Sequence, residues 1–414
     1  MRRESWISSV MLRNWWLEFG KMLLRFAIAL MAVAALVWLG YQFWRLLWEA
    51  DPIWASSPVG AVDLMMRYDE VHGWFSGRPV YGGPNAGYPP ASFVLLWPLL
   101  GWLELSPARW LWAVASAAAL VWLIYLLIQD SGAETTLERV FVALIPLALY
   151  PTGATIGNGQ LIVLLLPALV AALTRLQRQR GWRDDLFAAS LMLIALVKPS
   201  VSVPFFWILL FVPRTWRPAA LVVAGYLALT LFAALFQDSS LIAILREWLA
   251  GVSGLASWGG YANLHALLAA LQLENWSLPA SMFLLVALGA WIYRHREADP
   301  WLLLGVTAFV TRFWTYHGWY DDLLILLPMI ALFRVAKRSS DERQGVVAGI
   351  IFACTLLVML APGGLYLLPP PWKTLYVIAQ VLVWFVGLIF LLDLTRRDRS
   401  EQVKQLRHPI ITGG

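Results

Sequence analysis

Three side chains in the sequence could carry out acid–base or phosphate chemistry, and each stands out from apolar surroundings. Asp63 lies between Val62 and Leu64, beyond the first long apolar run, and a carboxylate there could take the proton of an acceptor hydroxyl as a general base. Lys198 interrupts an apolar run just before a proline, where it could hold a phosphate as a point charge. His317 lies among aromatic residues, where it could stabilise a phosphate leaving group or carry a proton.

Each of these residues also has an ordinary structural explanation. Asp63 could cap a helix, Lys198 could extend from a helix end to the membrane interface, and His317 could belong to an interfacial aromatic belt. Asn158 and Gln160 flank Gly159, and their amides offer hydrogen-bond donors and acceptors to sugar hydroxyls or phosphate oxygens. A plain polar turn is the commoner explanation of such a pair.

We predict neither a metal ion nor a cofactor. The loop after Asp63 contains Asp69 and Glu70 but no Asp-x-Asp or Glu-x-Asp pair of the kind that holds a divalent cation, and we expect both residues to be solvated loop charges. The histidines show no ligand spacing with one another. The P-loop, dinucleotide-binding and Gly-x-Ser-x-Gly patterns are absent from the sequence.

The composition indicates what must position these side chains. Hydrophobic residues make up 60% of the 414 residues and charged residues only 14%, against about 45–50% and about 25% in soluble domains. This balance excludes a cytosolic enzyme, a disordered chain and a secreted disulfide scaffold, and the single cysteine, Cys354, excludes an internal disulfide. We therefore predict an all-α, polytopic integral membrane protein that forms one transmembrane domain over residues 1–414, in contact with membrane lipids.

A membrane-spanning helix needs roughly 20 apolar residues. The apolar run at 91–104 follows two prolines, and we expect it to enter the membrane and return on the same side. By this measure we predict about twelve crossings, near residues 22–48, 108–128, 138–152, 159–174, 185–197, 200–213, 217–237, 277–294, 300–313, 320–335, 344–361 and 372–393.

Basic residues predict the orientation. They are concentrated before residue 26 and at 175–183, 334–343 and 396–407, and the positive-inside tendency places such segments in the cytoplasm. Both termini are then cytoplasmic in a plasma (inner) membrane protein, and the net charge of +6 reflects orientation rather than binding to nucleic acid. The stretches 50–90 and 237–276 lie on the outer side.

The polar segments all fall on that outer side. Ionisable groups at membrane depth are costly and commonly line a cavity. We therefore predict a polar cavity at the outer face. It would be formed by the acidic loop at 63–70, Tyr88-Pro89-Pro90, Gly157 to Gln160, Lys198-Pro199 and Tyr316-His317.

Taken together and in this order, the motifs resemble glycosyltransferase family 87, a family of membrane glycosyltransferases with the GT-C fold that includes phosphatidylinositol-mannoside mannosyltransferases. The resemblance covers about residues 60–335. It is carried by Asp63-Leu64 with Arg67-Tyr68, Trp74 to Tyr81, Tyr88-Pro89-Pro90, Pro98-Leu99, Asn158-Gly159-Gln160 before an apolar run, Lys198-Pro199, and His317 with Tyr320-Asp321.

The resemblance implies a polyprenyl-phosphate-linked sugar as donor, most often mannose, and a lipid or glycan as acceptor on the outer face. It implies that Asp63 is the catalytic base and that His317 lies near the donor phosphate. The family pattern has one aspartate after the tyrosine of its late His … Tyr-Asp segment. This chain has two, Asp321 and Asp322, and either could correspond to it. The expected substrate-binding residues are Arg67, Tyr68, Tyr81, Tyr88, Asn158, Gln160, Lys198, Tyr320 and Asp321.

Two other functions fit the same sequence. Many spans with a broken helix at Lys198-Pro199 would suit a transporter or flippase, although no repeated halves are visible. The high tryptophan content is also compatible with a non-catalytic subunit of a larger membrane complex. Neither alternative requires Asp63, whereas an inverting, metal-independent transferase does.

Overall fold

The computed structural model describes residues 2–48, 60–81, 87–175, 181–212, 216–256 and 262–407. Every named element in these ranges is a helix, so the all-α prediction is confirmed. The elements are α1 (Arg2–Leu47), α2 (Val62–Phe75), α3 (Pro90–Leu100), α4 (Leu105–Asp130), α5 (Thr136–Ala148), α6 (Tyr150–Asn158), α7 (Ile162–Arg175), α8 (Trp182–Ala195), α9 (Pro199–Phe211), α10 (Arg217–Ala234), α11 (Leu241–Ala256), α12 (Leu264–Ala270), η1 (Glu274–Trp276), α13 (Ser277–Arg294), α14 (Pro300–Trp314), η2 (Trp319–Ile325), α15 (Leu326–Arg338), α16 (Glu342–Met359), α17 (Gly364–Leu367) and α18 (Trp372–Arg407).

Six helical segments in the described residues are long and apolar enough to cross a membrane, which makes this a membrane protein. The other six predicted crossings correspond to helices of 13 to 15 residues or to broken helices, so twelve crossings stay a prediction. The six segments are Gly20–Leu47, Leu105–Asp130, Arg217–Ala234, Glu274–Arg294, Glu342–Met359 and Trp372–Arg397.

The predicted crossing at 138–152 is two helices rather than one. Leu149 is extended, with ψ 136°, and separates α5 from α6. Pro151 lies in the first turn of α6, where the missing amide hydrogen costs no helical hydrogen bond. Helix α6 then ends at Asn158, directly before Gly159, and its axis is bent by 118° from that of α7. This break places Gln160 in a turn inside the helical bundle.

The apolar run predicted at 91–104 folds as α3, which has 11 residues and a length of about 16 Å. The hydrocarbon core of a bilayer is about 30 Å thick, so α3 is too short to cross it as a straight helix. Within the predicted outer stretch 50–90, the residues from Val62 to Phe75 fold as the helix α2. Helix α2 contacts both α3 and α4.

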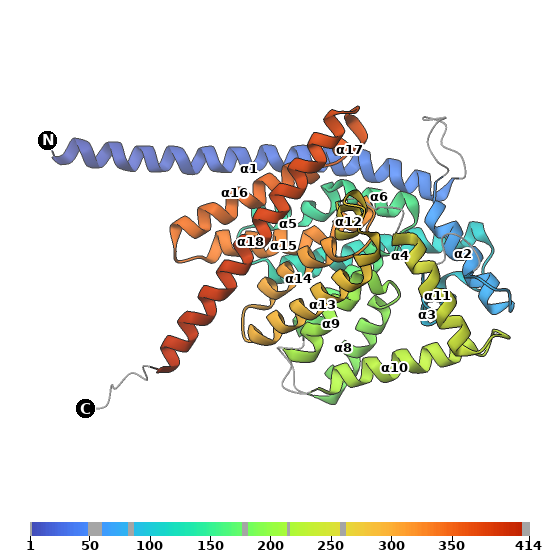
Figure 1. The fold of residues 1–414 in the computed structure, drawn as a ribbon. Helices are drawn as coiled ribbons and strands as arrows, with labels where there is room; N and C mark the ends of the chain where they lie inside the picture. Colours follow the sequence, from blue (N-terminus) through green and yellow to red (C-terminus); the bar gives the residue numbers. More distant parts are fainter. Residues whose placement is uncertain are drawn as a thin grey trace.

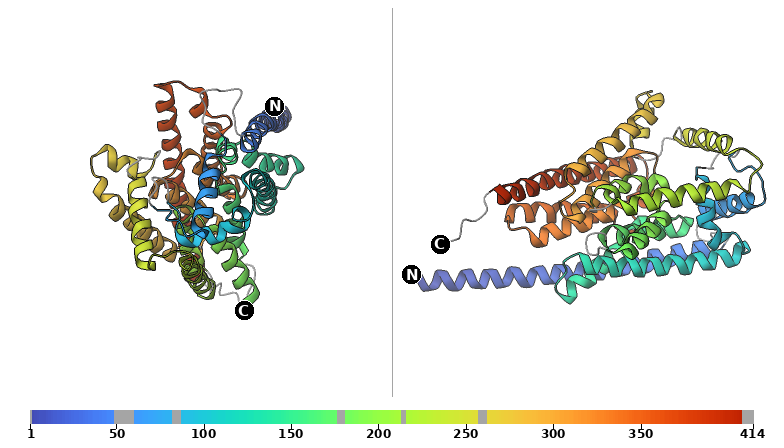
Figure 2. Two further views of the ribbon diagram at one scale, coloured as in Figure 1. Left: turned by 90° about the vertical axis from the view of Figure 1, so that its right-hand side faces the viewer. Right: turned by 90° about the horizontal axis from the view of Figure 1, so that it is seen from below.

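The helices form an elongated bundle with two distinct ends (Figure 1). The start of α1 and the end of α18 lie at one end, and α2 and α3 lie at the other, in both Figure 1 and the right-hand view of Figure 2. Helices α6 and α7 lie in the interior, where nearly every residue is buried. Helix α2, within the predicted outer stretch 50–90, is therefore far from the start of α1 and the end of α18.

Candidate functional site

The break between α8 and α9 places Lys198 beside the η2 turn. Lys198 directly precedes Pro199, the first residue of α9. Its Nζ donates a hydrogen bond to Asp321 Oδ1 at 2.6 Å and lies 4.9 Å from the centre of the Tyr320 ring. Asp321 Oδ2 accepts from His317 Nδ1 at 3.1 Å. Four predicted site residues from two distant segments are thus brought together.

Gln160 connects this network to Asp63. The Gln160 Oε1 accepts a hydrogen bond from Lys198 Nζ at 3.5 Å, and the side chain of Gln160 is also hydrogen-bonded to the Asp63 carboxylate. Because Oε1 accepts from Lys198, the amide nitrogen is the group that donates to Asp63. The α6–α7 turn therefore bridges a carboxylate on α2 and an ammonium at the α8–α9 break.

Gly159 allows α2 to lie directly against this turn. A Cβ atom at Gly159 would lie 2.4 Å from the Leu64 Cβ, and its φ of +69° is in the left-handed region that favours glycine. The Ala61 amide donates to the Gly157 carbonyl at 2.8 Å. These contacts fix the first turn of α2, which carries Asp63.

Burial and charge set the protonation of three groups. Burial raises the pKa of Asp63 above its usual value, despite the opposing effects of Gln160 and Lys198. Burial alone would also raise the pKa of Asp321, but the adjacent Lys198 ammonium and His317 hold it well below its usual range. Burial lowers the pKa of His317, so its ring is neutral at pH 7. With Nδ1 donating to Asp321, Nε2 is a buried acceptor with no hydrogen-bond partner among the described residues.

Arg67 lies on the same side of α2 as Asp63, one turn further along the helix. Its guanidinium carbon lies 4.3 Å from the centre of the Tyr88 ring, and its Nη1 lies 2.7 Å from Glu70 Oε2. The expectation that Glu70 is a solvated loop charge is therefore wrong, because a buried arginine pairs with it; Asp69 is exposed, as expected. Burial raises the pKa of Glu70 to about 7, although Arg67 opposes the shift.

Three other predicted residues have different surroundings. The Tyr68 hydroxyl donates to the Leu103 carbonyl at 3.0 Å, so Tyr68 faces the α3–α4 connection rather than the Lys198 network. The Tyr81 hydroxyl donates to the Tyr88 carbonyl at 2.9 Å, so Tyr81 contacts the residue whose ring lies against Arg67. Asn158 is half-buried at the end of α6, next to the turn that contains Gln160.

The two adjacent carboxylates, Asp321 and Asp322, point to different networks. Asp322 is fully buried and accepts hydrogen bonds from Arg312 Nε and the Tyr150 hydroxyl. Gln380 Nε2 donates to the Tyr150 hydroxyl at 3.0 Å. The sequence analysis missed Arg312, Tyr150 and Gln380. A charged Arg312 within an apolar helix was the available signal, because such residues are rare at membrane depth and are usually paired.

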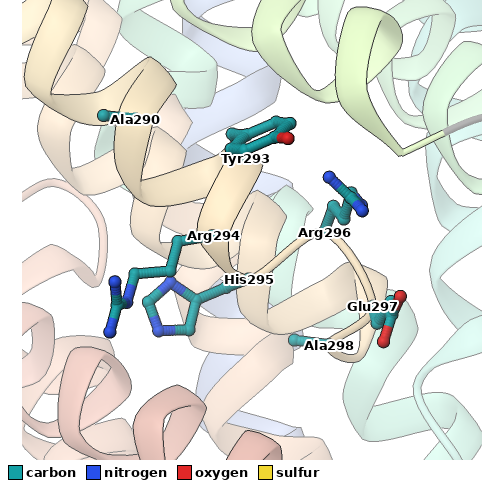
Figure 3. A pocket seen from close by; sticks show the side chains of 7 residues that line it. All are labelled: Ala290, Tyr293, Arg294, His295, Arg296, Glu297 and Ala298. Carbon is teal, nitrogen blue, oxygen red and sulfur yellow. The ribbon is translucent and has the colours of Figure 1, made fainter.

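Figure 3 shows a cavity at the end of α13 that is lined by Ala290, Tyr293 and residues 294–298. None of the predicted site residues lines it, so this is not the predicted outer-face cavity, which stays a prediction. Within the described part of the chain, no group of three or more His, Cys, Asp or Glu side chains could hold a metal ion.

The sequence was compared with models of known protein families and with curated proteins. The family model described as glycosyltransferase family 87 matches residues 87–315, more than half of the 414-residue chain. The matched region includes Tyr88, Asn158, Gln160 and Lys198, and it ends two residues before His317. No curated protein matches the chain.

Proposed function

Because the chain belongs to glycosyltransferase family 87 and is a membrane glycosyltransferase, we propose that it moves mannose from a polyprenyl-phosphate donor to a hydroxyl of a lipid or glycan acceptor. A transferase needs a group that takes the acceptor proton and a group that meets the leaving phosphate. The observation that carries the proposal is the position of Gln160, whose amide contacts both the Asp63 carboxylate and the Lys198 ammonium. The side chain of Gln160 thus bridges the proposed base, Asp63, and the proposed cation, Lys198.

The proposed reaction is an inverting displacement. The acceptor hydroxyl oxygen attacks the anomeric carbon, its proton passes to Asp63, and the bond between the anomeric carbon and the phosphate oxygen breaks. The raised pKa of Asp63 suits a base better than that of a free aspartate, because proton transfer is more favourable to a stronger base. The products are the glycosylated acceptor and polyprenyl phosphate.

Lys198 and His317 receive the leaving phosphate in this proposal. Lys198 is a fixed cation that is already oriented by Asp321, so it costs little reorganisation during the reaction. The negative charge of the bound phosphate favours protonation of the neutral His317, whose unpartnered Nε2 then donates to a phosphate oxygen. Since the site supplies its own cation, the proposed reaction is independent of a metal ion.

A lipid-linked donor agrees with the surroundings of the site. A polyprenyl chain stays in the bilayer, so the enzyme needs no nucleotide-binding domain, and the sequence contains no nucleotide-binding motif. The chain ends and α2 lie at opposite ends of the bundle. With both termini in the cytoplasm, as the basic segments predict, the site would face the outside of the plasma membrane.

Transfer assays with purified protein test the proposal. We expect the enzyme to move radiolabelled mannose from polyprenyl-phosphate-mannose to a membrane lipid extract, and to do so in EDTA. Lys198→Gln should bind the donor more weakly by about ten- to hundredfold, as expected for a lost charge-assisted contact. Absence of transfer with mannose, glucose and arabinose donors would contradict the proposed reaction, and inhibition by EDTA would contradict metal independence.

A further inference from the structure

Arg109 is a buried cation outside the site described above. It lies in the second turn of α4 and is only 2% exposed. Its Nη2 contacts the sulfur of Met65 on α2 at 3.2 Å. Its Nε and Nη1 atoms are buried and have no hydrogen-bond partner in the described residues, and it belongs to no ion pair there.

The same face of α4 carries a second unpartnered donor. Trp112 lies one turn after Arg109 and is fully buried, and residues three apart on a helix lie on one side. The Trp112 indole nitrogen has no hydrogen-bond partner among the described residues. Two donor side chains with unused capacity therefore follow each other along the inner side of α4.

A buried arginine without an ion-pair partner, such as Arg109 among the described residues, is expected to bind an anion. The guanidinium stays charged in proteins and cannot escape burial by losing its proton, and an unpaired buried charge is strongly destabilising. The thioether of Met65 is only a weak acceptor. A phosphate fits best, because its oxygens match the planar fork of the guanidinium in a bidentate pair.

The position of Arg109 identifies the source of the phosphate. Helix α4 is a candidate membrane span that begins at Leu105, so Arg109 lies about 6 Å along the helix from its first residue. That is close to the level of the lipid headgroups, which carry the phosphates of a bilayer. Phospholipid phosphates therefore lie at about the level of Arg109, and because Arg109 is only 2% exposed, contact with them requires a neighbouring side chain to move.

This site is separate from the one that contains Asp63. Met65 follows Asp63 by two residues, and at about 100° per residue the two side chains leave α2 on opposite sides. Tyr68 and His72 share the Met65 side, and they bind the carbonyls of Leu103 and Leu100. Helix α2, which contacts α4, thus lies between Arg109 and the Lys198 network.

We propose that Arg109 and Trp112 bind the phosphate of a membrane glycerophospholipid at the junction of α2 and α4. The flexible Met65 side chain covers Arg109 and moves aside when the phosphate binds. The bound headgroup supports the face of α2 opposite Asp63, and so stabilises the position of the helix that carries the carboxylate. This binding involves no sugar donor and holds whether or not the proposed transfer reaction is correct.

Binding to delipidated, full-length protein in detergent tests the inference. The probes are dioctanoyl-phosphatidylglycerol, dioctanoylglycerol (which lacks the phosphate), polyprenyl phosphate and inorganic phosphate. We expect phosphatidylglycerol to bind more tightly than the other three. Arg109→Gln should weaken its binding by about ten- to hundredfold, the effect of losing a charge-assisted pair. The matched control is Arg78→Gln, which removes an exposed arginine near α2 and should leave the affinity unchanged.

Thermal unfolding of the lipid-free protein separates ligand binding from a structural role. Without lipid, Arg109→Gln should unfold at a higher temperature than the wild type, because it removes an unpaired buried charge. If the variant does not fold, Trp112→Phe, which keeps the charge and removes one donor, should still weaken phosphatidylglycerol binding severalfold. Equal binding of phosphatidylglycerol and dioctanoylglycerol to the wild type would overturn the inference, and tighter binding of polyprenyl phosphate would overturn the assignment to a glycerophospholipid.

Discussion

Replacing Gly159 by alanine should slow sugar transfer by about a hundredfold. The new Cβ would lie 2.4 Å from the Leu64 Cβ, so reaching an ordinary contact of 3.4 Å requires a displacement of about 1 Å. Leu64 belongs to the helical turn that carries Asp63, so the base moves with it. A misplacement of about 1 Å can cost about 10²-fold in rate, or about 2.7 kcal/mol of activation free energy.

The assay measures kcat for mannose transfer and, separately, the Kd of the donor. Because Lys198 and Asp321 do not depend on Leu64 for their contacts, we expect donor binding to be nearly unchanged in Gly159→Ala. The φ of +69° adds about 1–2 kcal/mol of backbone strain, so thermal unfolding must show that the variant is still folded. Gly40→Ala is the control, since no atom lies within 4 Å of its new Cβ. A folded Gly159→Ala enzyme with the wild-type kcat would refute the reasoning.

Three further predictions follow from the charged groups. Transfer should fall as the pH drops through the raised pKa of Asp63, because only the carboxylate can take the proton, and a kcat/KM profile checks this. Stability should decrease as the pH rises from about 4.5 to about 7, because the folded state holds the Glu70 proton more tightly than the unfolded state. Glu70→Gln should make this slope shallower in thermal unfolding measured against pH, and the part that stays comes from Asp63, whose pKa is also raised. Asp322→Asn should lower the free energy of unfolding by about 3–5 kcal/mol, because Arg312 is left buried without its carboxylate. The exposed pair of Asp393 provides the control, since Asp393→Asn should cost under about 1 kcal/mol in the same denaturant titration.

Residue types and spacing indicated the two chain breaks at which this candidate site lies. A lysine before a proline within an apolar run indicated a broken helix, because proline interrupts helical hydrogen bonding, and the amide-rich Gly-Asn-Gly-Gln sequence indicated a turn. Both breaks are present, and they bring Lys198 and Gln160 together. The structure, not the sequence pattern, shows that Asp63 and Arg67 lie on one side of a helix, because the sequence analysis treats 63–70 as a loop and these residues belong to α2.

The hydrogen-bond partners of side chains that are far apart in the sequence could not be predicted from the sequence. Nothing local distinguishes Asp321 from Asp322, and only the packing of α14 and α6 against η2 shows that Arg312 and Tyr150 take the second carboxylate. The sequence analysis expects Glu70 to be exposed, because charged residues such as Glu70 and Arg67 are common on protein surfaces. Only the structure shows that the two side chains are buried as a pair. Apolar length alone does not fix the number of membrane crossings for a related reason, since short apolar helices such as α3 can be buried in a bundle without spanning the bilayer.

The most direct test of the account compares Asp63→Asn with Asp69→Asn, two substitutions of the same chemistry on one helix. Asp63 contacts Gln160 in the site, whereas Asp69 is exposed. The measurement is mannose transfer from polyprenyl-phosphate-mannose, with donor binding measured on the same preparations. The account predicts that Asp63→Asn binds the donor but loses transfer by at least about 10²-fold, a loss typical of removing a general base, while Asp69→Asn behaves as the wild type. Transfer by Asp63→Asn at the wild-type rate would contradict the assignment of Asp63 as the base.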